Sequence, residues 1–242
     1  MDLDCESFPP AKRPTRIVIQ LNGDVTPYSA ENFRRLCVGG LAPPATPGAA
    51  GDADAGGFKG SHFHDLCPDM HVKGGRRGTA LMPPNEDGGR ELPLAGDGAG
   101  TNASAFAGGQ LFASENFDEA HGEGTVSSVA SGKRGDQHGS EWFVCLSGDS
   151  DFTTSRHNGT HVVIGRVVRG LSAVKELSES MRSTAWGLRI VDQGLRGYSN
   201  TGRPAYPVWV ADCGELEGHT ATRRKSCFPD NLEDKERKSS GS

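Results

Sequence analysis

The sequence of 242 residues has no long apolar run and no excess of positive charge. Its apolar runs, such as Val162–Gly165, fall far short of the roughly 20 residues that a membrane-spanning helix needs. The 26 Lys and Arg residues are outnumbered by 31 Asp and Glu residues, and the net charge of −5 argues against nucleic acid as a partner. Residues 1–4 show neither the basic nor the apolar stretch of a secretory signal peptide. We therefore expect no membrane partner and an intracellular protein, cytoplasmic or nuclear.

Paired cysteines and aromatic residues are also scarce. The six cysteines stand singly, without a C-x-x-C motif, which is typical of reduced thiols in the cytosol or nucleus. Aromatic residues make up 7% of the chain and apolar residues 34%, which is low for a compact enzyme but too high for general disorder. His62, His64, Cys67 and His71 match no standard zinc spacing, and Gly96–Gly100 lacks the Lys-Ser/Thr of a phosphate loop. The sequence therefore predicts neither a metal nor a cofactor.

Glycine and proline are abundant instead, with 34 and 14 residues, which argues against a helical bundle. Short alternating or β-branched segments predict strands over residues 1–6, 16–21, 61–66, 71–74, 124–130, 142–146, 160–168 and 208–212. Two segments predict helices: Ser29–Cys37, with Ser29 as its N-cap, and Leu171–Met181. Many short strands with two helices indicate a mainly β domain, a barrel or a sandwich capped by helices.

Seven short blocks carry a more specific signal. They are Ser29–Cys37 (SAENFRRLC), Phe58–His64 (FKGSHFH), Gly74-Gly75, Leu111–Phe117 (LFASENF), Gly139–Phe143 (GSEWF), Gly159–Gly165 (GTHVVIG) and Asp212–Leu216 (DCGEL). In this order they resemble the cyclophilin family, and the resemblance covers most of residues 1–216. It implies a closed eight-stranded β-barrel capped by two α-helices, with a groove that binds proline-containing peptide or protein segments. It also implies peptidyl-prolyl cis-trans isomerisation, which needs no cofactor.

Three segments are expected to be surface insertions in such a domain. Residues 41–57 contain 13 Ala, Gly or Pro residues among 17, and residues 76–110 are rich in Gly, Ala, Asn and Pro. A third insertion is expected at about residues 182–197. We therefore predict one cyclophilin-like domain over residues 1–216, with insertions that offer surfaces for a protein complex. Residues 217–242 are predicted to form a disordered polar tail.

The chain departs from the family at two catalytic positions. The arginine that follows Phe-His in the family is Asp65 here, and the family's glutamine is Lys73. Rotation about an X-Pro bond restores the lone pair of the prolyl nitrogen, which the family's arginine stabilises by donation; a carboxylate cannot donate. The family places these positions on neighbouring strands, so Asp65 and Lys73 are expected to form an ion pair. Alternatively, Lys73 supplies a substitute donor, although Lys lacks the planar fork of Arg.

The substrate-binding positions are also partly changed. The family's pocket Phe-Met, its Ala-Asn step and the tryptophan that shapes its groove are replaced, whereas a pocket phenylalanine and histidine survive. In this sequence the replaced positions are Met70 and His71, Val129 and Ala130, and Arg156, and the retained ones are Phe143 and His161. We expect a cyclosporin-insensitive protein that binds proline-containing segments or a protein partner, with weak or absent isomerase activity. The alternative is an active isomerase that assists protein folding.

Overall fold

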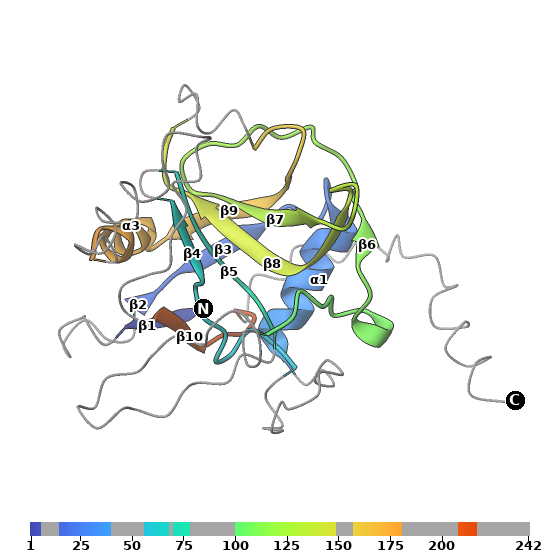
Figure 1. The fold of residues 1–242 in the computed structure, drawn as a ribbon. Coiled ribbons are helices and arrows are strands. Elements are labelled where there is room, and N and C mark those ends of the chain that lie inside the picture. The colour runs from blue at the N-terminus through green and yellow to red at the C-terminus, as the bar shows by residue number, and fades with distance from the viewer. Residues whose placement is uncertain are drawn as a thin grey trace, which may run out of the picture.

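The computed structural model describes residues 1–5, 15–39, 56–67, 70–77, 100–148, 157–180 and 208–216. These residues hold ten β-strands, two α-helices and one short 3-10 turn, η2 (Ala107–Gly109). Figure 1 shows the helices α1 (Pro27–Val38) and α3 (Leu171–Ser180) on opposite sides of the strands. Arg156, most of the expected insertions and the tail beyond residue 216 lie outside the described residues.

The strands form two antiparallel sheets. The larger sheet has the order β3 (Val18–Leu21), β9 (Val162–Arg169), β7 (Thr125–Ser131), β8 (Gln137–Cys145), β5 (His71–Gly74) and β4 (Asp65–Cys67), with β6 (Phe112–Ala113) against β8. The smaller sheet has the order β10 (Val208–Asp212), β1 (Asp2–Cys5) and β2 (Thr15–Arg16). The structure therefore confirms a mainly β protein with two helices. A single closed ring of eight strands is not established among the described residues.

Trp142 on β8 is the centre of the core between the larger sheet and α1. Its ring lies 5.4 Å from Phe33 on α1, 6.0 Å from Phe58 and 5.5 Å from Phe63, measured between ring centroids. All four rings are at least 96% buried, and full burial of one such side chain stabilises a fold by about 1.5–3 kcal/mol. Gly75, at a φ of 95°, closes over this cluster, and a Cβ there would overlap the Trp142 ring. The Gly74-Gly75 block is thus explained by close packing.

Helix α1 begins earlier than the sequence predicted. Ser29 was expected to be the N-cap, but the helix starts at Pro27, a residue whose fixed φ suits the first turn. Thr26 precedes it and makes no side-chain cap. Instead, the Glu115 carboxylate accepts hydrogen bonds from the backbone N–H groups of Tyr28 and Ser29, each at 2.8 Å. A side chain distant in sequence therefore caps α1.

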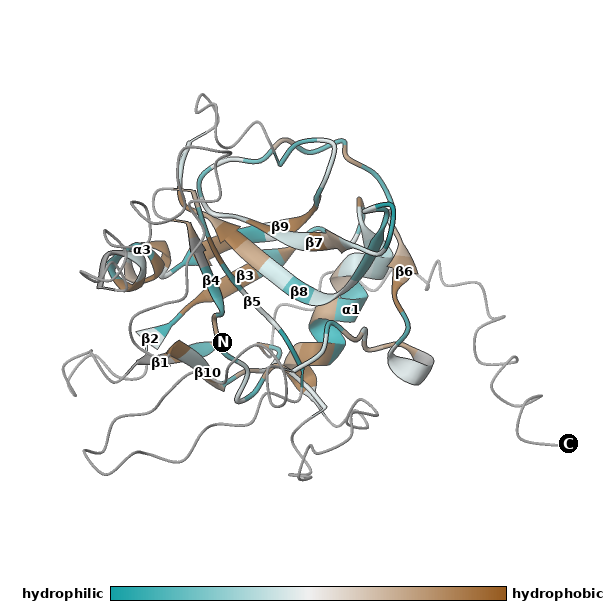
Figure 2. Cartoon of the chain, viewed as in Figure 1, coloured by the Kyte–Doolittle hydropathy of each residue, from teal (hydrophilic) through white to brown (hydrophobic). Residues whose placement is uncertain are grey.

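Strand β8 changes character along its length, and this change positions the site. Residues Gln137–Glu141 are mainly hydrophilic, whereas Trp142–Cys145 are hydrophobic (Figure 2). The apolar half is at least 98% buried. The two halves meet beside β5, where Lys73 pairs with Phe143 and Gly74 with Trp142. Glu141 and Phe143, on either side of this junction, each carry one part of the site.

Candidate functional site

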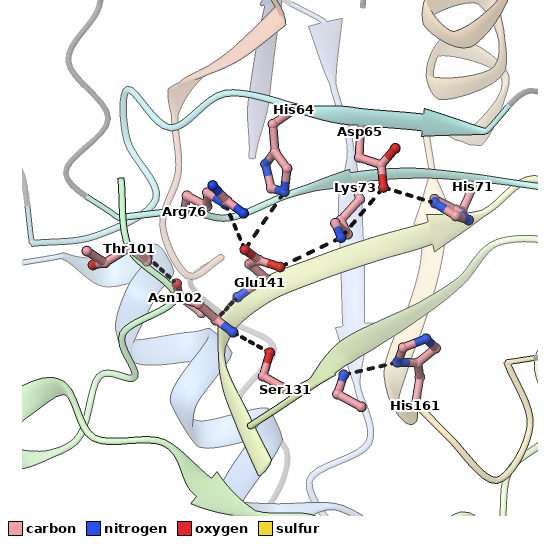
Figure 3. A network of polar contacts seen from close by, with 12 residues as sticks. His64, Asp65, His71, Lys73, Arg76, Thr101, Asn102, Ser131, Glu141 and His161 are labelled. Carbon is pink, nitrogen blue, oxygen red and sulfur yellow. Dashed lines mark hydrogen bonds and ion pairs between the residues drawn. The ribbon is translucent and has the colours of Figure 1, made fainter. Parts of the chain in front are cut away.

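Asp65 and Lys73 face each other across β4 and β5. The two residues are directly paired in the antiparallel register, which places their side chains on the same face. The Lys73 Nζ lies 3.6 Å from the Asp65 Oδ2 (Figure 3). Both side chains are about four-fifths buried. The ion pair expected from the sequence is therefore confirmed.

Glu141 on β8 extends this pair into a network that sequence reasoning missed. Its Oε2 lies 3.8 Å from the Lys73 Nζ, and its Oε1 accepts a hydrogen bond of 2.7 Å from the Arg76 Nε (Figure 3). The His64 Nε2 is 3.9 Å from the same Oε1. Lys73 thus lies between two carboxylates, those of Asp65 and Glu141. An acidic residue beside Trp142 in a buried strand was the available signal, because such a carboxylate needs a cation on the next strand.

The titration behaviour of the network follows from burial and charge. Burial acts to raise the pKa of Asp65, but the opposing pull of His71, Lys73 and His64 leaves that pKa below its usual value. Burial lowers the pKa of His64 to about 4, so its imidazole is neutral at neutral pH. The His71 Nε2 lies 3.8 Å from the Asp65 Oδ2, which is too long for a hydrogen bond. The network joins the carboxyl groups of Asp65 and Glu141 to the side chains of Lys73 and Arg76.

A second cluster surrounds Phe143, and we call it the imidazole cluster. Four imidazole rings contact the Phe143 ring, with centroid distances of 5.4 Å for His71, 5.8 Å for His121, 4.8 Å for His157 and 5.1 Å for His161. His121 is stacked at an interplanar angle of 9°. Sequence reasoning found His71 and His161 and missed the other two. Because His71 also contacts Asp65, it joins the imidazole cluster to the polar network.

Burial keeps His121, His157 and His161 of the imidazole cluster uncharged. It lowers the pKa of His157 and that of His161 to about 3, with further lowering by the neighbouring imidazoles. The pKa of His121 is also lowered by burial, although a contact with Asn158 opposes the shift. These rings therefore act as neutral imidazoles at neutral pH, each with one donor and one acceptor nitrogen.

Three other expected site residues lie around this cluster. The Ala130 N–H donates a hydrogen bond of 3.0 Å to the His161 Nδ1, which fixes the His161 proton on Nε2 (Figure 3). Val129 is 7% exposed and packs in a small apolar cluster with Phe143. Met70 lies in the turn before β5, where its N–H donates to Cys67 and its carbonyl accepts from Leu146. Arg156, the last expected position, cannot be placed because it lies outside the described residues.

Asn102 supports the polar end of β8 and was not found from the sequence. Its Oδ1 accepts a hydrogen bond of 2.8 Å from the Glu141 N–H, and its Nδ2 donates one of 2.7 Å to the Ser131 Oγ (Figure 3). A Cβ on Gly139 would overlap Asn102, so only glycine fits there. These contacts fix the backbone of Glu141.

Among the residues that the structure describes, no group of three or more His, Cys, Asp or Glu side chains is arranged to hold a metal ion. None of the described helices is long and apolar enough to cross a membrane.

Comparison with known proteins identifies the family to which the chain belongs. Residues 11–214 match the family described as cyclophilin type peptidyl-prolyl cis-trans isomerase/CLD. The chain is also 31% identical, over 202 residues, to peptidyl-prolyl cis-trans isomerase H of Rhizopus delemar, a match that covers 83% of this chain and 86% of that relative. The chain therefore belongs to the cyclophilin family.

Proposed function

We propose that this cyclophilin binds proline-containing segments with weak or absent peptidyl-prolyl isomerase activity. The observation that carries the proposal is the carboxylate of Asp65 at the family's arginine position, held by Lys73 at 3.6 Å. Isomerisation crosses a barrier of roughly 18–20 kcal/mol, and a donor to the prolyl nitrogen lowers it. Asp65 offers no such donor. By analogy with other single transition-state donors, its loss costs about 10²–10³ in rate.

Lys73 is a poor substitute for the missing arginine. Its ammonium lies between the carboxylates of Asp65 and Glu141, so its charge is already compensated within the site. An ammonium is also a point charge without the planar fork that fixes the direction of an arginine donor. Substrate binding is less affected, because Phe143 and His161 keep the residue types of the family.

Exchange and titration experiments by NMR test binding and catalysis separately. The full chain is mixed with an Ala-Pro peptide, and the cis-trans exchange rate is compared with that given by an active cyclophilin. We expect peptide-induced shifts at Phe143 and His161, with an exchange rate about 10²–10³ lower. Lys175→Gln, which removes an exposed lysine paired with Glu123 on another part of the fold, is the matched control for changes at Lys73. Absence of any peptide-induced shift would reject the proposal.

The second candidate function is an active isomerase that assists protein folding. The geometry of Lys73 favours it in one respect: both carboxylate contacts, at 3.6 and 3.8 Å, are longer than hydrogen bonds, so the N–H groups can turn to a substrate. In that case the unmodified protein catalyses cis-trans exchange of the Ala-Pro peptide at a rate near that of an active cyclophilin. Lys73→Gln then removes the activity, whereas Lys175→Gln keeps it.

We also propose that the two sheets belong to one closed barrel over residues 1–216. A short chain connection at one edge of the larger sheet and a β-bridge at the other edge support closure. Ile17, fully buried, is the only residue between β2 and β3. His62, shortly before β4, forms a bridge to Trp209 on β10. The smaller sheet therefore adjoins both edges of the larger one. We propose further that this domain carries surface insertions at residues 41–57, 76–110 and about 182–197. It is followed by a polar tail at residues 217–242.

The cellular setting of the protein is proposed from its cysteines and charge. Among the described residues, Cys37, Cys145 and Cys213 form no disulfide, which supports a reducing compartment, the cytosol or the nucleus. The insertions are proposed as surfaces for a protein partner, and cyclosporin is proposed not to bind. Fractionation of cells that express the tagged full chain tests the compartment.

A further inference from the structure

The imidazole cluster contains buried nitrogens that lack hydrogen-bond partners among the described residues. They are the Nδ1 of His71 and the Nε2 atoms of His121 and His157. The three residues are 8%, 1% and 8% exposed. Each belongs to a ring in contact with Phe143. Three buried nitrogens without a hydrogen-bond partner in the described part of the chain therefore lie around one phenylalanine ring.

Buried polar atoms normally have hydrogen-bond partners, so three unpaired nitrogens around one ring need an explanation. Packing alone does not supply one, because an apolar side chain fills the same space without an unpaired nitrogen. At the His71 position the family itself has an apolar methionine. The nearby His138 shows what pairing looks like in this fold: its ring nitrogens contact the Ser114 Oγ at 2.8 Å and the Ser128 Oγ at 3.0 Å. The imidazole cluster therefore fits a partner that arrives from outside the chain.

The charges next to the cluster restrict the chemistry of that partner. An anion is disfavoured, because the Asp65 carboxylate contacts His71 and the Glu141 carboxylate follows in the same network. A metal ion is disfavoured, because no three ligands converge among the described residues. A neutral hydroxyl group suits the site, because it donates and accepts and so pairs with either nitrogen of a neutral imidazole.

We propose that the site around Phe143 prefers a proline ring that carries a hydroxyl group over plain proline. This inference rests on the proposed function, since it assumes that a proline-containing segment occupies the site. The Phe143 ring provides the apolar contact for the pyrrolidine ring, and His71 and His157 pair with the hydroxyl. The unpaired nitrogens and the Phe143 ring are buried, so the hydroxylated ring enters as these imidazoles turn about χ2 and bring a nitrogen toward it.

Titration of the full chain with two peptides tests the preference. The peptides are Ala-Ala-Pro-Phe and the same sequence with 4-hydroxyproline, and binding is followed by NMR with ¹⁵N-labelled histidine. We expect the hydroxylated peptide to bind about fivefold more tightly, the effect of one added hydrogen bond. The shifts of the His71 Nδ1 and His157 Nε2 are expected to change only with that peptide.

Variants show whether the imidazoles cause the preference. His157→Leu and His71→Met are each expected to lose the preference and to bind the two peptides with equal affinity, whatever that affinity is, and Lys175→Gln is expected to keep the preference. Thermal melts of each variant verify that it is folded. Equal affinity of the unmodified protein for both peptides would overturn the inference and leave the proposed function standing. Binding of neither peptide would overturn both. Tight binding of Zn²⁺ alone, with loss of the histidine signals, would identify a metal as the partner and overturn the inference.

Discussion

The Lys73 Nζ lies 3.6 Å from the Asp65 Oδ2 and 3.8 Å from the Glu141 Oε2, so one ammonium is shared between two carboxylates. Glu141 has a second partner, Arg76, at 2.7 Å, whereas the only other side chain that the structure describes in polar contact with Asp65 is that of His71. The charge at residue 65 therefore depends on residue 73 more strongly than the charge at residue 141 does. Any attempt to restore the family's arginine must take Lys73 into account.

A double-mutant cycle measures this dependence as isomerase activity. Asp65→Arg alone is expected to gain little activity, because the new guanidinium faces the Lys73 ammonium in a mostly buried site. Asp65→Arg with Lys73→Gln restores a donor beside a neutral neighbour. It should exceed the product of the two single effects, by about tenfold for a coupling of about 1.4 kcal/mol. Peptide exchange by NMR gives the four rates. If the effect on the rate in the double variant equals the product of the two single effects, the two side chains are not coupled. High isomerase activity in the unmodified protein would mean that another residue supplies the donor.

Acid should unfold this protein well above the pH at which its carboxylates titrate. The pKa is lowered to about 3 in His157 and His161 and to about 4 in His64 and His138, whereas an imidazole in the unfolded chain binds a proton below about pH 6.5. Folding stability is then full above about pH 6.5. It falls by up to about 1.4 kcal/mol per pH unit for each such histidine as the pH decreases toward the folded values.

Circular dichroism against pH tests this expectation. We expect a cooperative transition between about pH 4 and pH 6. The lowered pKa of Asp65 has the same sign, because the stability that it contributes is lost as its carboxylate protonates, but in a more acidic range. His157→Leu should move the midpoint to lower pH by removing one proton-binding group. A chain that stays folded at pH 3 would contradict the assignment of neutral, buried imidazoles.

The local features of the fold were predictable from the sequence, and contacts between distant segments were not. The Asp65–Lys73 pair could be predicted because the family that the sequence resembles places these two positions on neighbouring strands, here β4 and β5. Glu141 was missed because its contact with Lys73 depends on how β8 lies beside β5, a pairing across many intervening residues. His121 and His157 were missed for the same reason, since each precedes a different strand and reaches Phe143 only after the sheet forms.

Removal of the distant cap on α1 should destabilise the fold. Glu115→Ala leaves the N–H groups of Tyr28 and Ser29 without their acceptor, and we expect a loss of about 1–2 kcal/mol. The free energy of unfolding in urea measures it. Glu123→Ala removes an exposed carboxylate paired with Lys175 and should change stability by less than about 0.5 kcal/mol. Equal effects of the two variants would show that Glu115 does not act as a cap.

Two buried histidines should respond oppositely to leucine at neutral pH. His157→Leu removes an unpaired nitrogen and should stabilise the protein by about 1 kcal/mol. His138→Leu, at a fully buried ring, removes the contacts with the Ser114 and Ser128 hydroxyls and should cost about 2 kcal/mol or more. Urea denaturation of both variants provides the comparison. A loss of stability in His157→Leu as large as that in His138→Leu would show that the His157 ring is held by a partner within the chain.

Cyclosporin should bind this protein weakly or not at all. The resemblance to the family puts Asp65, which lies 3.6 Å from Lys73, at the position of the arginine and Arg156 near that of the tryptophan that shapes the groove. A ligand whose polar groups lose their partners on binding forfeits about 1–3 kcal/mol for each such group. Calorimetric titration of the full chain is expected to give no measurable heat at micromolar concentration. Arg156→Trp with Asp65→Arg and Lys73→Gln should recover binding, because it restores the tryptophan and the arginine without a facing ammonium. Sub-micromolar binding by the unmodified protein would refute the expectation.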